Sequence, residues 1–121
     1  MKKIIALSLL VVMTLISCSK EEEPIVVPPS NNCDTVEMSF QNDVTPILRT
    51  NCFGCHSTSA AFGNIILDNY DEVAKVISAG RFLGSIKHES GFSPMPQNAA
   101  QLSDCNIDKI SAWVEDGSPN N

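Results

Sequence analysis

Five consecutive residues, Cys52-Phe53-Gly54-Cys55-His56, bring two thiols and one imidazole close together in the chain. Positions i, i+3 and i+4 share one face of a helical turn, so these three side chains can be presented on the same side. Two thiols so placed can reach two vinyl groups at one edge of a porphyrin, while the adjacent imidazole ligates the iron. The pattern is typical of covalent haem c attachment, with Cys52, Cys55 and His56 as its anchors.

Two other kinds of site could use the same cysteine pair. A thioredoxin-like redox dithiol would need a strand before the motif and a surrounding βαβ pattern, and the sequence shows neither. A zinc site would need four ligands, namely Cys33, Cys52, Cys55 and Cys105. Zinc sites usually take their cysteines from two closely spaced pairs, and only one such pair is present. Haem attachment is therefore the preferred interpretation.

The iron of an electron carrier needs a second axial ligand, and a methionine thioether fills that position while favouring the reduced form. Residues 18–121 contain only two methionines, Met38 and Met95. Met95 lies between two prolines, which restrict the φ angles of the loop and remove two backbone donors. A stiff loop should aim the sulfur, so we expect His56 and Met95 to be the two iron ligands. His88 is the alternative to Met95.

This arrangement resembles class I cytochrome c, and in particular the small cytochrome c domains of bacterial lipoproteins. The resemblance covers about residues 33–119 and rests on the haem motif, on the Met95 loop and on a last helix over residues 102–114. It implies an all-α fold of three to five helices around one covalently bound haem. The first and last helices would cross and share core residues: Phe40 or Val44, Ile110 and Trp113.

The hydrophobic periodicity predicts four helices and no strand, over residues 39–50, 70–79, 81–87 and 103–114. Pro46 lies inside the first of them, where it marks either the first turn or a kink. Asp68 or Asn69 can cap the second helix, and Gly80 can end it. Ser103 can cap the last helix.

The first seventeen residues predict a signal peptide. Two lysines precede a largely apolar run of thirteen residues, Ile4–Ile16, which is too short to span a bilayer. The segment ends in Leu-Ile-Ser-Cys, which resembles the lipobox of bacterial lipoproteins and would leave Cys18 as a lipid-modified first residue. A buried N-terminal helix is the alternative, and the basic start and the small residue before the cysteine disfavour it. We expect membrane attachment through the lipid on Cys18.

Residues 18–32 are rich in polar residues and proline and lack helical or strand periodicity, which predicts a flexible tether. The glutamates at positions 21–23 resemble the signal that sends some lipoproteins to the outer face of the outer membrane. A merely solvated linker explains them equally well. We expect an outer-membrane lipoprotein of the cell envelope that faces the periplasm or the cell surface.

The chain is acidic, with 14 Asp and Glu against 8 Lys and Arg and a formal net charge of −6 at pH 7. Loss of the signal peptide removes two lysines, so the charge of the mature chain becomes −8. This balance disfavours nucleic acid and anionic lipid as partners.

Cys33 and Cys105 remain once the lipid and the haem have claimed three of the five cysteines. An even remainder in an exported protein predicts a disulfide between them. This bond would tie the start of a single cytochrome domain, residues 33–119, to its last helix.

These features predict a mono-haem, one-electron carrier and not an enzyme, because the chain has one haem motif and no additional acid–base residue near the Met95 loop. A monomer that exchanges electrons with a donor and an acceptor redox protein is expected. The alternatives are a ligand sensor or peroxide-reactive enzyme with a labile sixth ligand, and an accessory haem subunit of a membrane redox complex. Residues 50–67 and 90–103 contain no charged residue, which predicts apolar docking to the partners.

Overall fold

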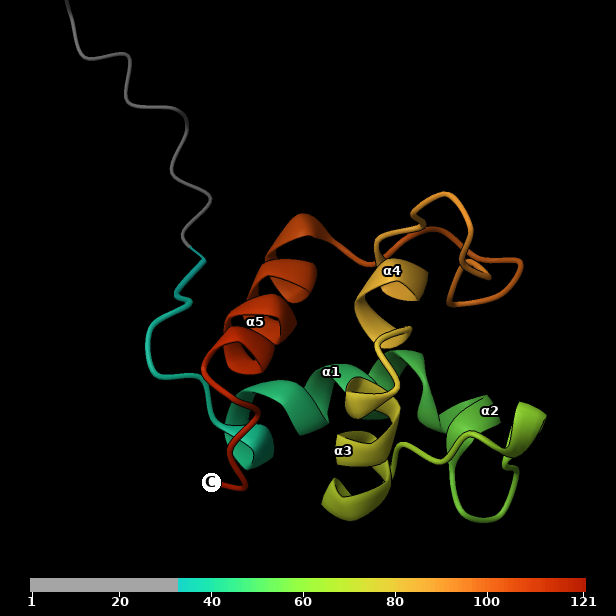
Figure 1. Cartoon of the computed structure of the whole chain (residues 1–121), viewed down its shortest axis with the longest axis horizontal. Helices are drawn as coiled ribbons and strands as arrows, with labels where there is room; N and C mark the ends of the chain where they lie inside the picture. The colour runs from blue at the N-terminus through green and yellow to red at the C-terminus, as the bar shows by residue number, and fades with distance from the viewer. Residues whose placement is uncertain (1–32) are drawn as a thin grey trace, which may run out of the picture.

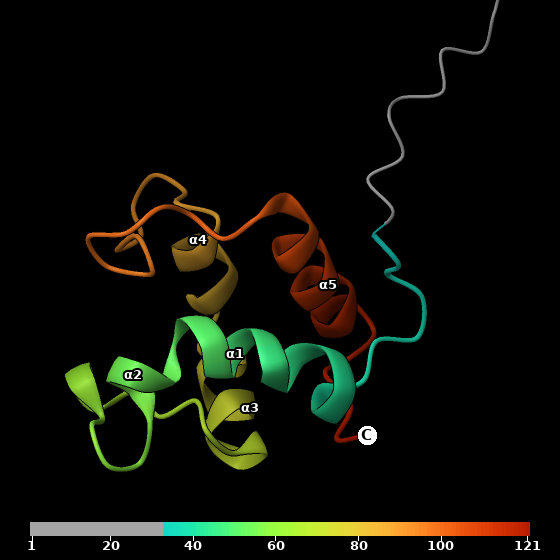
Figure 2. The same ribbon diagram turned by 180° about the vertical axis from the view of Figure 1, so that it is seen from behind.

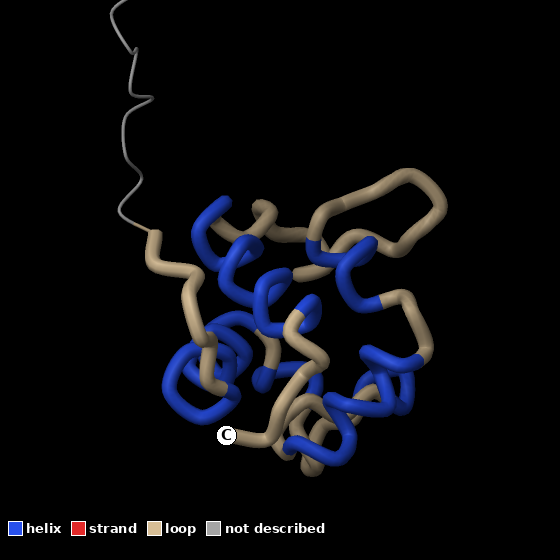
Figure 3. Tube along the Cα trace, turned by 60° about the vertical axis from the view of Figure 1, so that its left-hand side comes forward, coloured by secondary structure: helices blue, strands red, loops and turns tan. Residues whose placement is uncertain are grey.

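The computed structural model describes residues 33–121, which are drawn in colour in Figures 1 and 2. The expected signal peptide at residues 1–17, the expected lipidation site Cys18 and the expected tether at residues 18–32 lie outside the described residues. The described part consists of helices joined by loops and contains no strand (Figure 3). The expected all-α fold class is therefore confirmed.

Seven helical segments follow one another along residues 33–121. Five of them are α-helical: α1 (Thr45–Asn51), α2 (Phe53–His56), α3 (Tyr70–Ser78), α4 (Phe82–Ile86) and α5 (Asp104–Glu115). Two are short turns of other helix types, the π-helical η1 (Phe40–Val44) and the 3₁₀-helical η2 (Phe62–Asn64). None of the helices within the described residues is long and apolar enough to cross a membrane.

The helix expected over residues 39–50 is present as η1 followed directly by α1. Ser39 caps it, because its Oγ accepts a hydrogen bond from the N–H of Asn42 at 3.2 Å. The N–H of Val44 reaches back five residues to the Ser39 carbonyl at 3.1 Å, which widens this turn into a π-helix. Pro46 lies in the first turn of α1, where its missing N–H costs no helical hydrogen bond.

The next two helices begin and end close to the expected residues. The Asn69 side chain caps α3 by accepting a hydrogen bond from the N–H of Glu72 at 3.1 Å. Gly80 follows α3 with a φ of +72°, a left-handed conformation that glycine adopts without steric cost. The short helix expected over residues 81–87 is present as α4.

The last helix, α5, is the longest helix within residues 33–121. Ser103 caps it by accepting a hydrogen bond from the N–H of Asn106 at 3.3 Å. Its apolar residues recur at helical spacing and face the core: Ile107, Ile110 and Trp113. The chain leaves the helix at Gly117, whose φ is +90°.

The core is centred where η1 meets α5. The rings of Phe40 and Trp113 lie with their centroids 5.4 Å apart, and Val44 and Ile110 are completely buried. Trp113 donates its indole N–H to the carbonyl of Pro119 at 2.9 Å, so its polar atom is satisfied within the core. These contacts bring the first and last helical regions together, as expected.

Asn121 holds the segment after α5 against η1, the first helical turn of the described residues. The carbonyl oxygen of Asn121 accepts hydrogen bonds from the Ser39 hydroxyl at 2.9 Å and from the Gln41 N–H at 3.0 Å. The N–H of Phe40 donates to the Asn121 side chain at 2.8 Å. The segment after α5 therefore lies beside η1, as the C-terminal label in Figure 1 shows.

Candidate functional site

The three motif side chains are positioned by the turn of helix that follows α1. The N–H of Cys52 donates to the Leu48 carbonyl at 2.8 Å, yet its φ of −124° breaks the helix there and redirects the chain into α2. The N–H of His56 then donates to the Cys52 carbonyl at 2.9 Å. Cys52 and His56 are thus separated by one helical turn, with Cys55 directly before the histidine.

The two thiols of the motif are free, although only two residues separate them. Cys52 is half-buried against the core and Cys55 is exposed. Burial, and to a smaller degree the neighbouring Cys55, raises the pKa of Cys52 to about 11. A redox dithiol depends on a thiolate whose pKa is lowered. The protonated Cys52 and the lack of a strand within residues 33–121 both disfavour a thioredoxin-like site.

The imidazole of His56 is oriented by the chain that follows it. Its Nδ1 lies 3.3 Å from the carbonyl oxygen of Ile65, and the N–H of Leu67 donates to the His56 carbonyl at 2.7 Å. A carbonyl can only accept, so Nδ1 carries the proton in this contact. The neutral imidazole then has an unprotonated Nε2, and no hydrogen bond to Nε2 is found within the described residues. This tautomer is the form that ligates a metal through Nε2.

The loop between α2 and α3 is closed by Asp68. Its carboxylate accepts hydrogen bonds from the N–H of Thr58 at 2.6 Å and from the Thr58 hydroxyl at 2.8 Å. The backbone hydrogen bond, followed by the hydroxyl bond, lowers the pKa of Asp68. The charged form is thereby favoured, and it holds the two ends of the loop that carries Ile65.

The two methionines within residues 33–121 have different environments. Met38 is 4% exposed, and its side chain packs in the hydrophobic core. Met95 is half-buried in the loop between α4 and α5, and its N–H donates to the Ser85 carbonyl at 3.0 Å. The Met95 carbonyl lies 3.0 Å from Nε2 of His88, which is exposed. Of the two thioethers, only that of Met95 lies outside the core.

The motif turn and the Met95 loop occupy the same end of the described part. In Figures 1 and 2, α2 and the loop between α4 and α5 both lie at the end of the horizontal axis that is opposite the C-terminus. Helix α4 directly precedes this loop, and its residues Phe82 and Ile86 are buried in the core, so it is the element that fixes where the loop begins.

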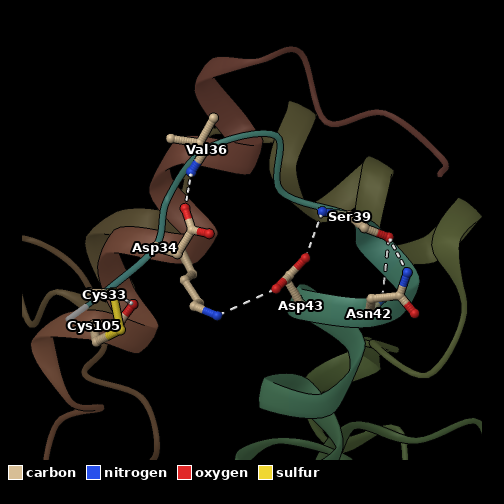
Figure 4. Close-up of polar contacts among 8 residues, drawn as sticks. Cys33, Asp34, Val36, Ser39, Asn42, Asp43 and Cys105 are labelled. Atoms are coloured by element: carbon tan, nitrogen blue, oxygen red, sulfur yellow. Dashed lines mark hydrogen bonds and ion pairs between the residues drawn. A yellow bond between two sulfur atoms is a disulfide. The ribbon is translucent and has the colours of Figure 1, made fainter.

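The expected disulfide between Cys33 and Cys105 is present (Figure 4). The Cα atoms of the two residues are 5.5 Å apart, and the bond joins the start of the domain to the first turn of α5. An ion pair supports the same connection, because Nζ of Lys109 lies 3.4 Å from the carboxylate of Asp43 at the end of η1. A crosslink of this sequence separation stabilises the fold by about 4 kcal/mol in the chain-entropy model.

The four-cysteine zinc site is not formed, because Cys33 and Cys105 are bonded to each other. No group of three or more His, Cys, Asp or Glu side chains within residues 33–121 is arranged to hold a metal ion. Within the described residues, the motif pair therefore has no cysteine or carboxylate partners with which to complete a purely protein-bound metal centre.

An open surface depression of about 380 Å³ is lined in part by Cys33, one of the two disulfide cysteines. Its lining includes the carboxylates of Asp108 and Glu115 and the residue Ser111, whose buried hydroxyl has no hydrogen-bond partner. The two carboxylates stand seven residues apart on α5, about 10 Å along the helix axis. This distance is too long for both carboxylates to coordinate one small cation.

Two contacts at the site were not predicted from the sequence. The Ile65 carbonyl contacts His56, and the His88 imidazole contacts Met95. No local pattern signals the first, and the second appears in the sequence only as a histidine near the Met95 loop. Comparisons of the chain with protein-family models, curated proteins and solved structures find no match.

Proposed function

We propose that the chain is a mono-haem c-type cytochrome with a class I cytochrome c-like fold, and that it carries single electrons at the cell envelope. Cys52 and Cys55 would form the two thioether bonds, and His56 and Met95 would hold the iron. The observation that carries this proposal is the state of the motif. One helical turn holds two free thiols beside an imidazole whose Nε2 is open.

The chain's own residues fit the group. When bound, haem supplies a metal centre that gains or loses one electron. The Ile65 carbonyl fixes the tautomer of His56. It also makes the unprotonated Nε2 a stronger electron-pair donor toward a metal. The half-buried Cys52 faces the core, which is where one edge of a covalently held ring would be sheltered from water. Met95 is preferred over His88 as the second ligand because Nε2 of His88 is engaged by the Met95 carbonyl.

The surface near the motif suits transient docking. Residues 50–67 and 90–103 carry no charge, although residues 33–121 are acidic overall. Phe62 in η2 is 63% exposed within the first of these segments, whereas most large apolar side chains are covered. An uncharged rim with an exposed aromatic ring favours a redox partner whose own contact surface is uncharged.

The proposed location is the outer membrane, through the lipid on Cys18, with the domain facing the periplasm or the cell surface. The disulfide supports an oxidising compartment, where such bonds form and persist. The same compartment is where haem c is attached. The proposed state is a monomer that meets its electron donor and acceptor in turn.

The test is a redox-titrated absorption spectrum of the purified wild type and of Met95→Ala. We expect covalently bound haem in both proteins, which a denaturing gel stained for haem shows. Loss of the thioether should lower the reduction potential and change the spectrum, because methionine ligation favours the reduced form. Met38→Leu is the matched control, since it removes the other methionine of residues 33–121 and conserves volume in the core.

The outcomes separate the parts of the proposal. A wild type that loses its chromophore on denaturation contradicts covalent attachment. A Met95→Ala spectrum identical to that of the wild type would move the ligand assignment to His88. Rapid cyanide binding by the wild type would favour the sensor or enzyme over the carrier, because it requires a labile sixth ligand.

A further inference from the structure

The C-terminus of α4 ends in a Schellman motif, a common way to satisfy the last helical carbonyls. The N–H of His88 donates to the Ser85 carbonyl at 3.3 Å, and the N–H of Glu89 donates to the Gly84 carbonyl at 2.9 Å. In this motif the residue after the cap adopts a left-handed conformation. His88 occupies that position with a φ of +53°.

A histidine is an unfavourable choice at this position. Left-handed backbone costs an L-residue about 1–2 kcal/mol, and glycine is the usual occupant because it has no Cβ. The same chain uses glycine after α3 and after α5, at Gly80 and Gly117. At the position directly after the cap residue, α4 therefore bears a conformational cost that α3 and α5 avoid, although Ser118, one residue beyond Gly117, is also left-handed.

The imidazole placed by this turn reaches the loop that follows. Nε2 of His88 lies 3.0 Å from the carbonyl of Met95, which can only accept, so Nε2–H is the donor. The N–H of Met95 donates to the Ser85 carbonyl at 3.0 Å, on the same turn. Both backbone polar groups of Met95 are thus held by the end of α4.

We propose that His88 is a positioning residue that holds the backbone of Met95 and thereby slows the release of its sulfur from the iron. This inference rests on the proposed haem ligation. It assigns His88 a role different from that of a rival ligand. The left-handed backbone at His88 is conformationally unfavourable, but it places the imidazole against Met95.

The test compares wild type with His88→Gly in the haem-loaded, full-length protein. Glycine fits the Schellman position, so the variant should keep or raise its melting temperature. The hydrogen bond to Met95 is lost, so the loop should open more often. Cyanide binding to the ferric protein should accelerate about two- to tenfold, which is the factor that one neutral hydrogen bond supplies. The amide hydrogen of Met95 should exchange faster by a similar factor.

Ser118→Gly is the matched control, because Ser118 also has a left-handed backbone, with a φ of +54°, but follows α5. It should gain stability without changing either rate. His88→Gln retains an N–H donor on a side chain of similar reach, and it should return both rates toward the wild type. Unchanged rates in His88→Gly, or equal acceleration in Ser118→Gly, would overturn the inference.

The two readouts keep this inference separate from the proposed function. If the purified protein holds no covalent haem, the proposed function fails. The exchange rate of the Met95 amide then still decides whether His88 holds the loop, because it reports the backbone contact without reference to the iron. If haem is bound and both rates are insensitive to His88, only the positioning role is wrong.

Discussion

The Ile65 carbonyl decides how the His56 imidazole can act. By accepting from Nδ1 at 3.3 Å, it selects the tautomer with an open Nε2 and limits rotation of the ring. The carbonyl comes from a loop and not from a helix, so its position depends on whatever closes that loop. Asp68 does so through its two hydrogen bonds to Thr58.

The loop closure by Asp68 should make stability depend on pH. The unfolded carboxyl has a pKa of about 3.9, and the hydrogen bonds from Thr58 lower the pKa in the folded protein. Its contribution is therefore complete above the unfolded pKa and is lost as the pH falls through the lower, folded pKa. We expect Asp68→Asn to be less stable than the wild type at neutral pH, with the difference disappearing in acid.

Urea denaturation at a series of pH values measures this difference. Thr58→Val is the graded control, because it removes the hydroxyl bond to Asp68 and keeps the backbone bond. Its loss of stability should be smaller than that of Asp68→Asn. A stability difference between Asp68→Asn and the wild type that stays constant down to acid pH would contradict the proposed closure.

The spacing of the motif predicted the shared turn of Cys52, Cys55 and His56, because positions three and four apart are neighbours in any helix. The Ile65 contact could not be predicted in this way. It depends on the path of the chain between residues 57 and 65, which includes left-handed backbone at Ala61 and Asn64. An alanine in that conformation gives no sequence signal, since its side chain does not favour it.

The α4 helix carries the Met95 loop through a close contact at Gly84. A Cβ built on Gly84 would lie 2.5 Å from Cδ2 of Phe92, so the absence of a side chain is what lets the ring lie against the helix. The Phe92 ring belongs to the chain segment that leads to Met95. The position of that loop is therefore linked to the surface of α4.

We expect Gly84→Ala to destabilise the protein by about 1–3 kcal/mol, the usual cost of overpacking. Because the Phe92 ring must shift, cyanide binding should also accelerate. Gly54→Ala is the matched control for stability alone, since Gly54 is also helical and an added Cβ meets no protein atom within 4 Å beyond its chain neighbours and its own helix backbone. The cyanide rate is compared with the wild type only, because Gly54 lies inside the proposed haem motif. Thermal unfolding measures the stability.

A double variant, Gly84→Ala with Phe92→Leu, should recover part of the lost stability, because the smaller side chain makes room for the methyl group. Strictly additive effects of the two substitutions would show that the ring contact is not the cause.

Longer helices could be predicted more reliably than short ones. The ranges expected for α3 and α5 agree with the structure because a capping residue begins each of them and a glycine follows each of them. Pro46 was ambiguous because proline suits both a first turn and a kink, and the π-helical turn of η1 before it resolved the choice. The turn at η2 has no periodicity to detect, since it contains only three residues.

The charges of the domain are unevenly distributed along the chain. Every charged residue after position 32 lies outside residues 50–67 and 90–103, the two segments that flank the candidate site. Electrostatic interactions between a charged partner and the acidic residues elsewhere in the domain are screened over about 10 Å in moderate salt. Electron transfer through the uncharged segments should therefore respond weakly to ionic strength.

Two small oxidants of opposite charge test this expectation: ferricyanide, which is anionic, and a cobalt(III) tris-phenanthroline complex, which is cationic. Each rate should change by less than about threefold over a tenfold range of ionic strength. Phe62→Glu places a charge on the exposed ring position, and it should give the two oxidants opposite salt dependences. A steep salt dependence in the wild type would contradict uncharged docking.

Trp113 is the only tryptophan of the chain, and it is completely buried against Phe40 with its indole N–H bound to the Pro119 carbonyl. Its fluorescence is therefore a built-in reporter of one defined place, the junction of η1 and α5. Separation of the first and last helical regions would expose the indole and shift its emission to longer wavelength. If haem is attached, energy transfer to the porphyrin would quench the tryptophan emission of the folded protein. Unfolding would then appear as an increase in fluorescence intensity. The stability differences expected for Asp68, Gly84 and His88 can thus be followed without any added label.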